Sequence, residues 1–276
     1  MEEMDLPDYG NLYPLQVDQL VPLEAAKGQL LITSLIFLGI IVYAIYRYWK
    51  LNDSVLMWML GAGIIAFFNE GNLEVLVHVT QPANGLYPMF WNYGMPMPLG
   101  LGVGYWGIFT LATYIAYRFV VTGLTKRGFW LLWVGIAASC LVMEIPGVAS
   151  GVYTYRGDQM LRIGGYPVYN LWINATGWLF SGLLIMVFEP VLKGWKRIAL
   201  SLLPCAAFAM SWGVIDIPIV NALNIQGMPD WGKWALWVFS FVLSILFTGT
   251  LVEIFATDSK NRWTIPWLNG DRRATV

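Results

Sequence analysis

Long apolar runs separated by short polar segments dominate the chain. A run of about 17–25 apolar residues is long enough to cross a bilayer as a helix. Seven candidates are present: Leu30–Ile45, Val55–Phe68 with a polar extension to Thr80, Pro98–Tyr117, Phe129–Ala149, Pro167–Leu192, Ile198–Val220 and Trp234–Ala256. We therefore predict one all-α transmembrane domain over residues 1–276, with an outer N-terminal segment, 1–28, and a cytoplasmic tail, 257–276.

Composition supports a membrane protein and excludes some functions. Hydrophobic residues make up 58% and charged residues 12% of the chain, and the mean hydropathy is +0.59, which is not typical of a soluble domain. The net charge of -1 offers no basic surface for nucleic acid. Cys140 and Cys205 lie inside apolar runs, where we expect small buried side chains. No cleavable signal peptide and no credible glycosylation site is recognised, which favours a bacterial inner membrane.

The basic residues predict the orientation, because Lys and Arg in short loops stay on the cytoplasmic side. With the N-terminus outside and the C-terminus inside, the outer side holds only Lys27, Arg156, Arg162 and Lys233. The inner side then holds the others: Arg47, Lys50, Arg118, Lys126, Arg127, Lys193, Lys196, Arg197, Lys260, Arg262, Arg272 and Arg273. Seven spans with this orientation are the topology that the charges favour.

Three carboxylic acids occupy similar depths in the predicted spans. Counted from the cytoplasmic start of its span, Glu70 lies about 22 Å, Glu144 about 22 Å and Asp216 about 27 Å up a helix that rises 1.5 Å per residue. A carboxylate within a span is costly, so each is a candidate functional residue. The other interpretation is that all three are interfacial and meet headgroup water.

Two of these acids share the same local sequence. Glu144-Ile-Pro146 and Asp216-Ile-Pro218 each place a proline two residues after the acid. A proline inside a helix leaves the carbonyl four residues earlier without its usual partner, which suits a polar cavity. Removal from water and a neighbouring carboxyl both favour the protonated form, so one member of such a group acts as an acid near neutral pH.

Glu70, Glu74 and His78 are spaced at four-residue intervals, so they share one face if the helix continues that far. This spacing suits a proton relay or a metal, but a single His without a second ligand motif is a weak metal signal. A structural, hydrogen-bonded His is the favoured interpretation, with Glu74 and His78 as secondary polar residues of the site. We expect no metal.

The predicted outer loops are rich in aromatic and amide side chains. An interfacial aromatic belt explains many of these residues without any site. Their position on the side that carries the acids instead favours a substrate-binding wall, because aromatic faces stabilise carbocations by cation–π attraction. The candidate substrate-binding residues are Trp91, Asn92, Tyr153, Tyr155, Tyr169, Trp172 and Asn174.

Two resemblances follow from these residues. Glu144, the Gly151-Val-Tyr153-Thr-Tyr155 segment, the Gly165-Tyr166-Pro167 segment and Trp172 resemble the order of motifs in integral-membrane carotenoid hydratases of the bacterioruberin pathway. The seven spans, with one acid in the second and one in the sixth, are similar to membrane-bound terpene cyclases of fungal meroterpenoid pathways. That resemblance implies metal-free cyclisation started by two acids, here Glu70 and Asp216; the Glu144 motif departs from the cyclase pattern.

The combined expectation is a membrane enzyme that acts on an isoprenoid or similar apolar lipid from the bilayer. Proton-initiated cyclisation, hydration or isomerisation would use Glu144 and Asp216 as acid and partner, with Glu70 as a second acid or terminating base. Tyr153, Tyr155, Trp91 and Trp172 would stabilise the cation. No nucleotide or flavin motif is present, so no cofactor is expected.

Three other classes stay open. The same acids suit a proton-coupled small-molecule transporter or a lipid-sensing receptor, and an assembly subunit would pair them with a partner's basic residues. A retinal protein is disfavoured, because the last span, Trp234–Ala256, has no interior Lys for a Schiff base.

Overall fold

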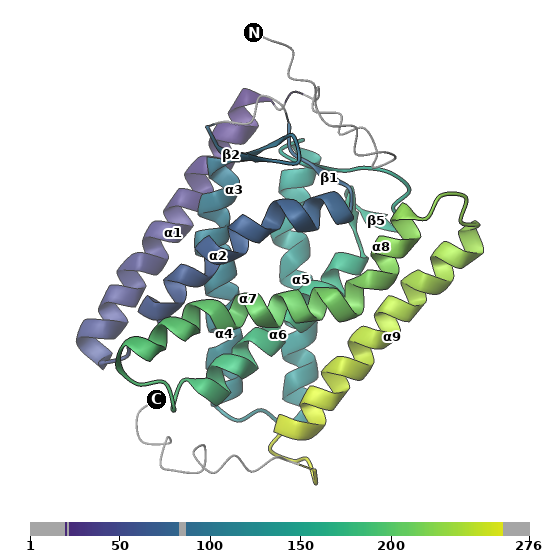
Figure 1. Ribbon diagram of the computed structural model, residues 1–276. Coiled ribbons are helices and arrows are strands. Elements are labelled where there is room, and N and C mark those ends of the chain that lie inside the picture. The colour runs from purple at the N-terminus through teal and green to yellow at the C-terminus, as the bar shows by residue number, and fades with distance from the viewer. Residues whose placement is uncertain (1–19, 21, 83–86, 262–276) are drawn as a thin grey trace.

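The chain folds into a bundle of long helices capped at one end by short strands (Figure 1). The computed structural model describes residue 20, residues 22–82 and residues 87–261. The helices are α1 (Leu23–Leu51), α2 (Val55–Leu76), α3 (Leu99–Gly104), η1 (Tyr105–Phe109), α4 (Thr110–Val121), α5 (Lys126–Ala149), α6 (Tyr169–Phe188), η2 (Gly194–Ile198), α7 (Ala199–Ser211), η3 (Trp212–Asp216), α8 (Ile217–Asn224) and α9 (Asp230–Phe255). η1 and η3 are π-helical turns within longer helices, and η2 is a 3-10 turn.

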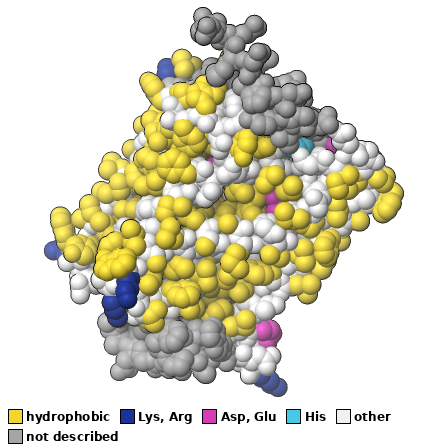
Figure 2. Space-filling model, viewed as in Figure 1, with side chains coloured by type: hydrophobic (Ala, Val, Ile, Leu, Met, Phe, Trp, Pro, Cys, Tyr) yellow, Lys and Arg dark blue, Asp and Glu magenta, His cyan; other side chains and the backbone are white. Residues whose placement is uncertain are grey.

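Six helical segments among the described residues are long and apolar enough to cross a membrane, which supports the predicted helical membrane protein. They are Leu23–Leu51, Leu99–Val121, Lys126–Ala149, Tyr169–Phe188, Gly194–Asn224 and Asp230–Phe255. The second predicted span, Val55–Phe68 with its extension, forms helix α2, which has 22 residues but is not among the six. Its second half contains polar residues, including Glu70 and Glu74. Figure 2 shows apolar side chains over most of one face, with Lys and Arg gathered at its lower edge.

Helix α6 lies at the centre of the bundle. Within its apolar window 72% of the residues are buried, against 17% for α1 and α5. It contacts α4, α5, α7 and α9. Gly182 allows the backbone of α4 to approach, since a Cβ there would lie 2.6 Å from the Tyr117 nitrogen. Thr176 Oγ1 accepts from Trp133 Nε1 at 2.9 Å and bonds Ser244 Oγ at 2.8 Å. Small residues and buried hydroxyls are the usual means of joining helices in lipid.

Short antiparallel ribbons, which the all-α prediction did not include, lie in the loops at the end where α1 begins. This end is called the outer end after the orientation predicted from the sequence. They pair β1 (Val79–Thr80) with β4 (Thr154–Tyr155), β2 (Pro88–Asn92) with β3 (Met95–Pro98), and β5 (Arg162–Ile163) with β6 (Tyr166–Pro167). In the first ribbon Val79 is opposite Tyr155. This pairing ties the segment after α2 to the segment after α5, and these two helices carry Glu70 and Glu144.

Closely spaced glycines bring α1 and α2 against the third span. A Cβ on Gly104 would lie 3.3 Å from the Thr33 methyl, and one on Gly107 would lie 3.3 Å from the Phe37 backbone, both in α1. On the other side, a Cβ on Gly63 of α2 would collide with the Tyr105 carbonyl oxygen. Backbone atoms cannot rotate away as a side-chain end can.

We therefore expect Gly63→Ala to destabilise the fold. Separating α2 from η1 should lower the free energy of unfolding by about 1–3 kcal/mol, the usual cost of overpacking. Thermal unfolding of the purified protein in detergent measures the change. Gly39→Ala in α1 is the matched control, because nothing lies within 4 Å of a Cβ there and alanine favours a helix. Equal melting temperatures for the two variants would contradict the close packing described here.

Candidate functional site

A cavity of about 620 Å³ lies between α1, α2 and the third span on one side and α5, α6 and the α7–η3 helix on the other. Loop residues close its outer end. The described lining residues are Ala25, Gly28, Gln29, Ile32, Thr33, Ile36, Glu70, Leu73, Glu74, Val77, Val79, Gln81, Gly100, Leu101, Gly104, Tyr105, Ile108, Phe109, Val142, Met143, Glu144, Pro146, Gly147, Ser150, Val152, Tyr153, Tyr155, Asn170, Asn174, Trp178, Phe208 and Trp212.

Glu144 is held by Tyr153, nine residues later. The Tyr153 hydroxyl donates to Glu144 Oε2 and lies 3.2 Å from the Glu144 carbonyl oxygen. Gly147 makes this contact possible, because a Cβ at that position would lie 2.7 Å from the Tyr153 ring. The helix stays continuous through Pro146, where the Ser150 hydroxyl donates to the Pro146 carbonyl at 2.7 Å. The Glu144 side chain is therefore fixed by one donor and directed into the cavity.

The Tyr153 phenol keeps its proton over a wide pH range. Burial raises the pKa of Tyr153 well above its usual value, and the nearby Glu144 carboxyl raises it further. Burial likewise raises the pKa of Tyr155, the next aromatic residue along the loop. Both hydroxyls are donors at neutral pH, so Tyr153 stabilises the negative charge that Glu144 gains when it releases a proton.

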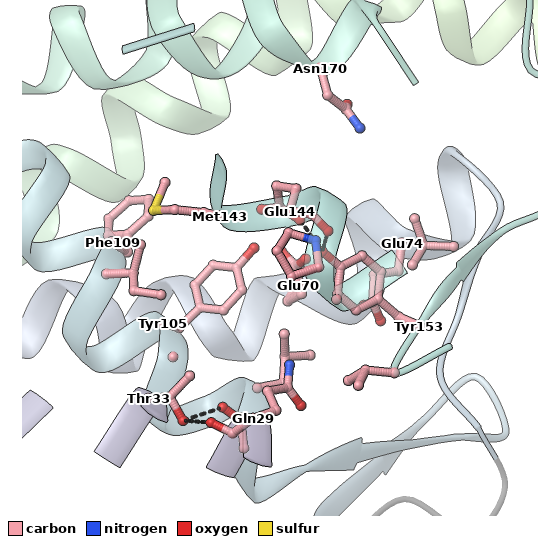
Figure 3. Close-up of a pocket in the computed structure, with 18 of the residues that line it drawn as sticks. Gln29, Thr33, Glu70, Glu74, Tyr105, Phe109, Met143, Glu144, Tyr153 and Asn170 are labelled. Carbon is pink, nitrogen blue, oxygen red and sulfur yellow. Dashed lines mark hydrogen bonds between the residues drawn. The ribbon is translucent and has the colours of Figure 1, made fainter. Parts of the chain in front are cut away.

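Glu70 lies beside Glu144 on the opposite wall (Figure 3). The Tyr105 hydroxyl, from the π-helical turn η1, faces the Glu70 carboxyl as a hydrogen-bond donor. Figure 3 shows Glu70, Glu144 and Tyr153 grouped together, with Tyr105 directed toward them. π-helical turns occur often at functional sites. The structure thus brings together two of the predicted catalytic acids, each with a tyrosine.

Glu74 is the third acid of the cavity. It is 3% exposed, and Gln81 Nε2 donates to its Oε1 at 2.5 Å. Its other oxygen, Oε2, has no hydrogen-bond partner among the described residues. Glu74 follows Glu70 by one helical turn, so the two carboxyls lie on the same face of α2.

His78 does not continue this face, which corrects the prediction from its spacing. Helix α2 ends at Leu76, and His78 has a positive φ of 58°. Its Nε2 bonds Asn224 Oδ1 at 3.0 Å, and its carbonyl accepts from the Arg156 backbone at 2.7 Å. The described residues contain no group of three or more His, Cys, Asp or Glu arranged to hold a metal. His78 therefore connects the loops beside the cavity.

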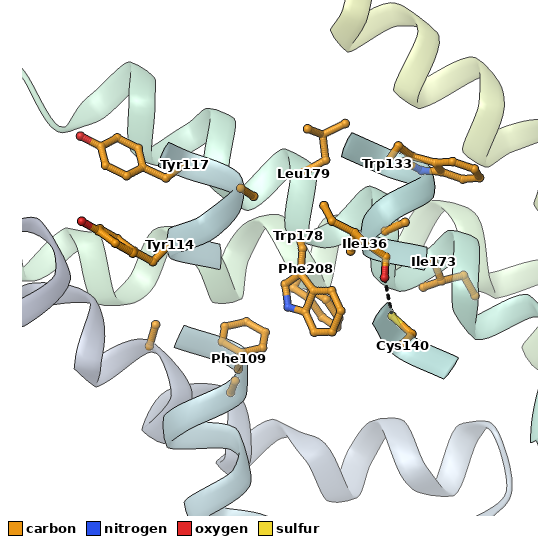
Figure 4. Packing of buried hydrophobic residues seen from close by; sticks show 14 of the residues in the cluster. Phe109, Tyr114, Tyr117, Trp133, Ile136, Cys140, Ile173, Trp178, Leu179 and Phe208 are labelled. Carbon is orange, nitrogen blue, oxygen red and sulfur yellow. Dashed lines mark hydrogen bonds between the residues drawn. The ribbon is translucent and has the colours of Figure 1, made fainter. Parts of the chain in front are cut away.

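The deep end of the cavity is aromatic and apolar. Phe208 packs its ring edge-on against Phe109 at 5.3 Å and tilted against Trp178 at 6.0 Å between centroids, as Figure 4 shows from nearby. Trp212 adds a further ring from η3. The cavity therefore has carboxyls and phenols toward its outer end and aromatic rings at its depth.

Two apolar residues of the cavity lining are also exposed on the surface of the bundle. Among its lining residues, Ile32 of α1 is 59% exposed and Val142 of α5 is 76% exposed. Both lie more than a turn inside their helices and both are apolar. Apolar side chains of the cavity lining are therefore also exposed on the surface of the bundle, on α1 and on α5.

Asp216 does not line this cavity, although its local sequence repeats that of Glu144. It is 1% exposed, and neither carboxyl oxygen has a hydrogen-bond partner among the described residues. The side chain of Tyr169 is its neighbour. Trp212, which precedes Asp216 by one helical turn, lines the cavity. The π-helical turn η3 ends at Asp216, just before Pro218. Of the three predicted catalytic acids, Glu70 and Glu144 are among the described lining residues of the cavity and Asp216 is not.

Some of the predicted substrate-binding residues line the cavity and others lie outside it. Tyr155 and Asn174 line the cavity with Tyr153. Trp172 lies between α6 and α9, where its Nε1 donates to Ser240 at 3.1 Å and its ring packs on Trp237. Trp91 is 59% exposed.

Two further candidates also lie outside the described lining. The Asn92 amide packs against Gly71 on α2. Tyr169 is buried beside Asp216.

Several lining residues were not anticipated from the sequence. Tyr105 and Trp178 lie inside predicted spans without a motif. Gln29 immediately precedes the first span, Gln81 lies in the loop after α2, and Asn170 lies in the first turn of α6. The glycines at positions 100, 102, 104 and 107 were the one available signal, because such spacing indicates close helix approach. The glycine spacing indicates that the third span packs closely against other helices, but it does not indicate which side chains face the cavity.

Comparison with protein-family models, with curated proteins and with solved structures finds no match to this chain.

Proposed function

We propose that the chain crosses the membrane seven times, with α2 as the remaining span. Figure 1 supports an odd number of crossings, because α1 begins and α9 ends at opposite ends of the bundle. The 22 residues of α2 extend about 33 Å at 1.5 Å per residue, enough to cross the hydrocarbon core.

The proposed orientation has the N-terminus outside and the C-terminus in the cytoplasm. The end that would be cytoplasmic carries ion pairs such as Arg47 with Asp53 at 2.5 Å and Arg197 with Glu189 at 2.6 Å. The cavity acids then lie in the outer half of the membrane. A bacterial inner membrane is the proposed location, with the site toward the periplasmic leaflet.

We propose that the protein is a membrane-embedded enzyme of isoprenoid or lipid metabolism. It would use carboxylic acids to start cyclisation, hydration or isomerisation of an apolar substrate, as an isomerase or a lyase. The observation that carries this proposal is one cavity that combines Glu70, Glu144 and Glu74 with an aromatic wall. Exposed apolar lining residues on α1 and α5 mark where we place its opening to lipid. The resemblance to membrane terpene cyclases and carotenoid hydratases supports the same class.

In this mechanism Glu144 is the acid. Its proton passes to an alkene carbon or an epoxide oxygen, leaving a Glu144 carboxylate that accepts the Tyr153 hydrogen bond. The positive charge on the substrate carbon is stabilised by ring faces. Glu70, which Tyr105 faces, removes a proton from a neighbouring carbon or from an attacking water, which completes the reaction.

The ring faces differ from those predicted from the sequence. Trp91 and Trp172 lie outside the described lining, so the cation-stabilising wall is assigned to Tyr153, Tyr155 and the deep rings Phe109, Trp178, Phe208 and Trp212. Asp216, two residues before Pro218 and behind the wall at Trp212, is proposed to support the site without touching substrate.

Incubation of the full-length protein in membranes with polyprenyl, epoxy-polyprenyl and carotenoid substrates tests the proposal. A product of unchanged mass would establish a cyclase or isomerase, and a gain of one water would establish a hydratase. Membranes without the protein are the control. Absence of any product from correctly folded protein would contradict the enzyme proposal and favour a transporter, for which uptake driven by a proton gradient is the next measurement.

A further inference from the structure

The charge of the cavity lining restricts which ligands it accepts. The described lining residues include three acids, Glu70, Glu74 and Glu144, and no Lys, Arg or His. A phosphate or carboxylate headgroup would enter without a counter-charge, and burying an unpaired charge is costly. Lipids with anionic headgroups therefore do not suit this cavity.

Two buried acceptors in the lining are left for a ligand. Glu74 is 3% exposed, and Gln81 occupies one of its oxygens while Oε2 has no partner among the described residues. Asn170 is also 3% exposed, and its Nδ2 donates to the Tyr155 hydroxyl at 3.0 Å, which leaves its Oδ1 without a partner among the described residues. Buried acceptors are usually satisfied, so two in one cavity point to a missing donor.

These acceptors also have fixed positions. The hydrogen bond from Gln81 holds the Glu74 carboxyl and the one to Tyr155 holds the Asn170 amide. Both residues stand near the outer end of their helices, whereas Trp178 lies two turns deeper on α6 than Asn170. A ligand with one donor group and a long apolar chain would match both ends at once.

We propose that the cavity selects an uncharged amphiphile with a hydroxyl group. The hydroxyl donates to Glu74 or Asn170, the apolar chain lies against the deep aromatic rings, and the molecule enters from the bilayer between Ile32 and Val142. This inference rests on the proposed function, since it names the class of substrate that the acids would act on.

Equilibrium binding of a labelled C20 prenyl alcohol to the full-length protein in nanodiscs tests the selection. Competition is measured with the unlabelled alcohol, the corresponding prenyl monophosphate and the corresponding hydrocarbon. We expect the alcohol to compete at concentrations at least tenfold lower than either of the others. A prenyl monophosphate that competes as well as the alcohol would overturn the proposal.

Two variants locate the hydroxyl. Glu74→Leu or Asn170→Leu should reduce the preference for alcohol over hydrocarbon about tenfold, measured as the ratio of the two competing concentrations in each variant. Glu24→Leu, which removes a carboxyl that is 84% exposed, is the control. An unchanged preference in both cavity variants would contradict the assignment of the acceptors.

The binding assay and the turnover assay fail independently. Preference for the alcohol without any product would overturn the proposed reaction but not the ligand class. Product formation together with preference for the phosphate would overturn the ligand class but not the reaction.

Discussion

Replacing Glu144 by Gln is expected to lower kcat of the proposed reaction by at least about 100-fold, the contribution usual for a general acid. Gln has the same shape but carries no proton of sufficient acidity. Its amide still meets the Tyr153 hydroxyl, which holds the wild-type carboxyl, so the fold should be retained. Initial rates with the best substrate from the panel measure the loss, and thermal unfolding verifies the structure.

Two companion variants make this result specific to Glu144. Tyr153→Phe removes the donor but leaves the acid, so it should reduce kcat less than Glu144→Gln. Asp216→Asn changes an acid that is buried outside the described lining and should retain more activity than Glu144→Gln. A rate for Glu144→Gln close to that of the wild type would remove Glu144 as the proton donor. A larger loss for Asp216→Asn would move that role to Asp216.

Val142→Trp is the second change with a large expected effect, because it narrows the proposed opening to lipid. Val142 is 76% exposed and lines the cavity. A bulky ring there should lower kcat/KM for a membrane-dissolved substrate about tenfold, equivalent to about 1.4 kcal/mol. The loss should come mainly through KM, since the acids and their tyrosines are unchanged.

Val134→Trp is the matched control for the opening. Val134 lies two turns earlier on α5 and is 55% exposed, but it does not line the cavity. Its replacement adds the same ring to the same lipid-facing helix and should leave kcat/KM unchanged. Equal losses in both variants, or none in Val142→Trp, would show that substrate does not enter between α1 and α5. Ile32→Trp repeats the test from the α1 side of the opening.

Helix positions were predictable from the sequence because they depend on local hydropathy. The predicted span Phe129–Ala149 differs from α5 only by three residues at its start, and Trp234–Ala256 lies close to α9. The third span extends farther than predicted, to Val121, since polar Tyr and Arg near its end lower the local hydropathy without ending the helix. The ribbons were not predictable, because each is held by a partner strand elsewhere in the chain.

The candidate site was predictable only in part, for a related reason. Glu144 and Asp216 have the same Ile-Pro sequence after the acid, but only Glu144 reaches the cavity. The local sequence specifies a buried acid beside a proline. It does not specify which neighbouring helix the acid faces. Trp172 shows the same limit, since its ring packs between α6 and α9.

By itself the sequence determined that this is a helical membrane protein, where its long helices lie, and that several acids are buried in them. These properties follow from the order of apolar and polar residues along the chain. Only the tertiary structure decided that Glu70, Glu74 and Glu144 share one cavity with Tyr105 and Tyr153. That arrangement depends on the pairing of β1 with β4, on the π-helical turns, and on glycines that admit a neighbouring backbone. The strand pairing and the glycine contacts join residues far apart in the chain, so no local pattern encodes them.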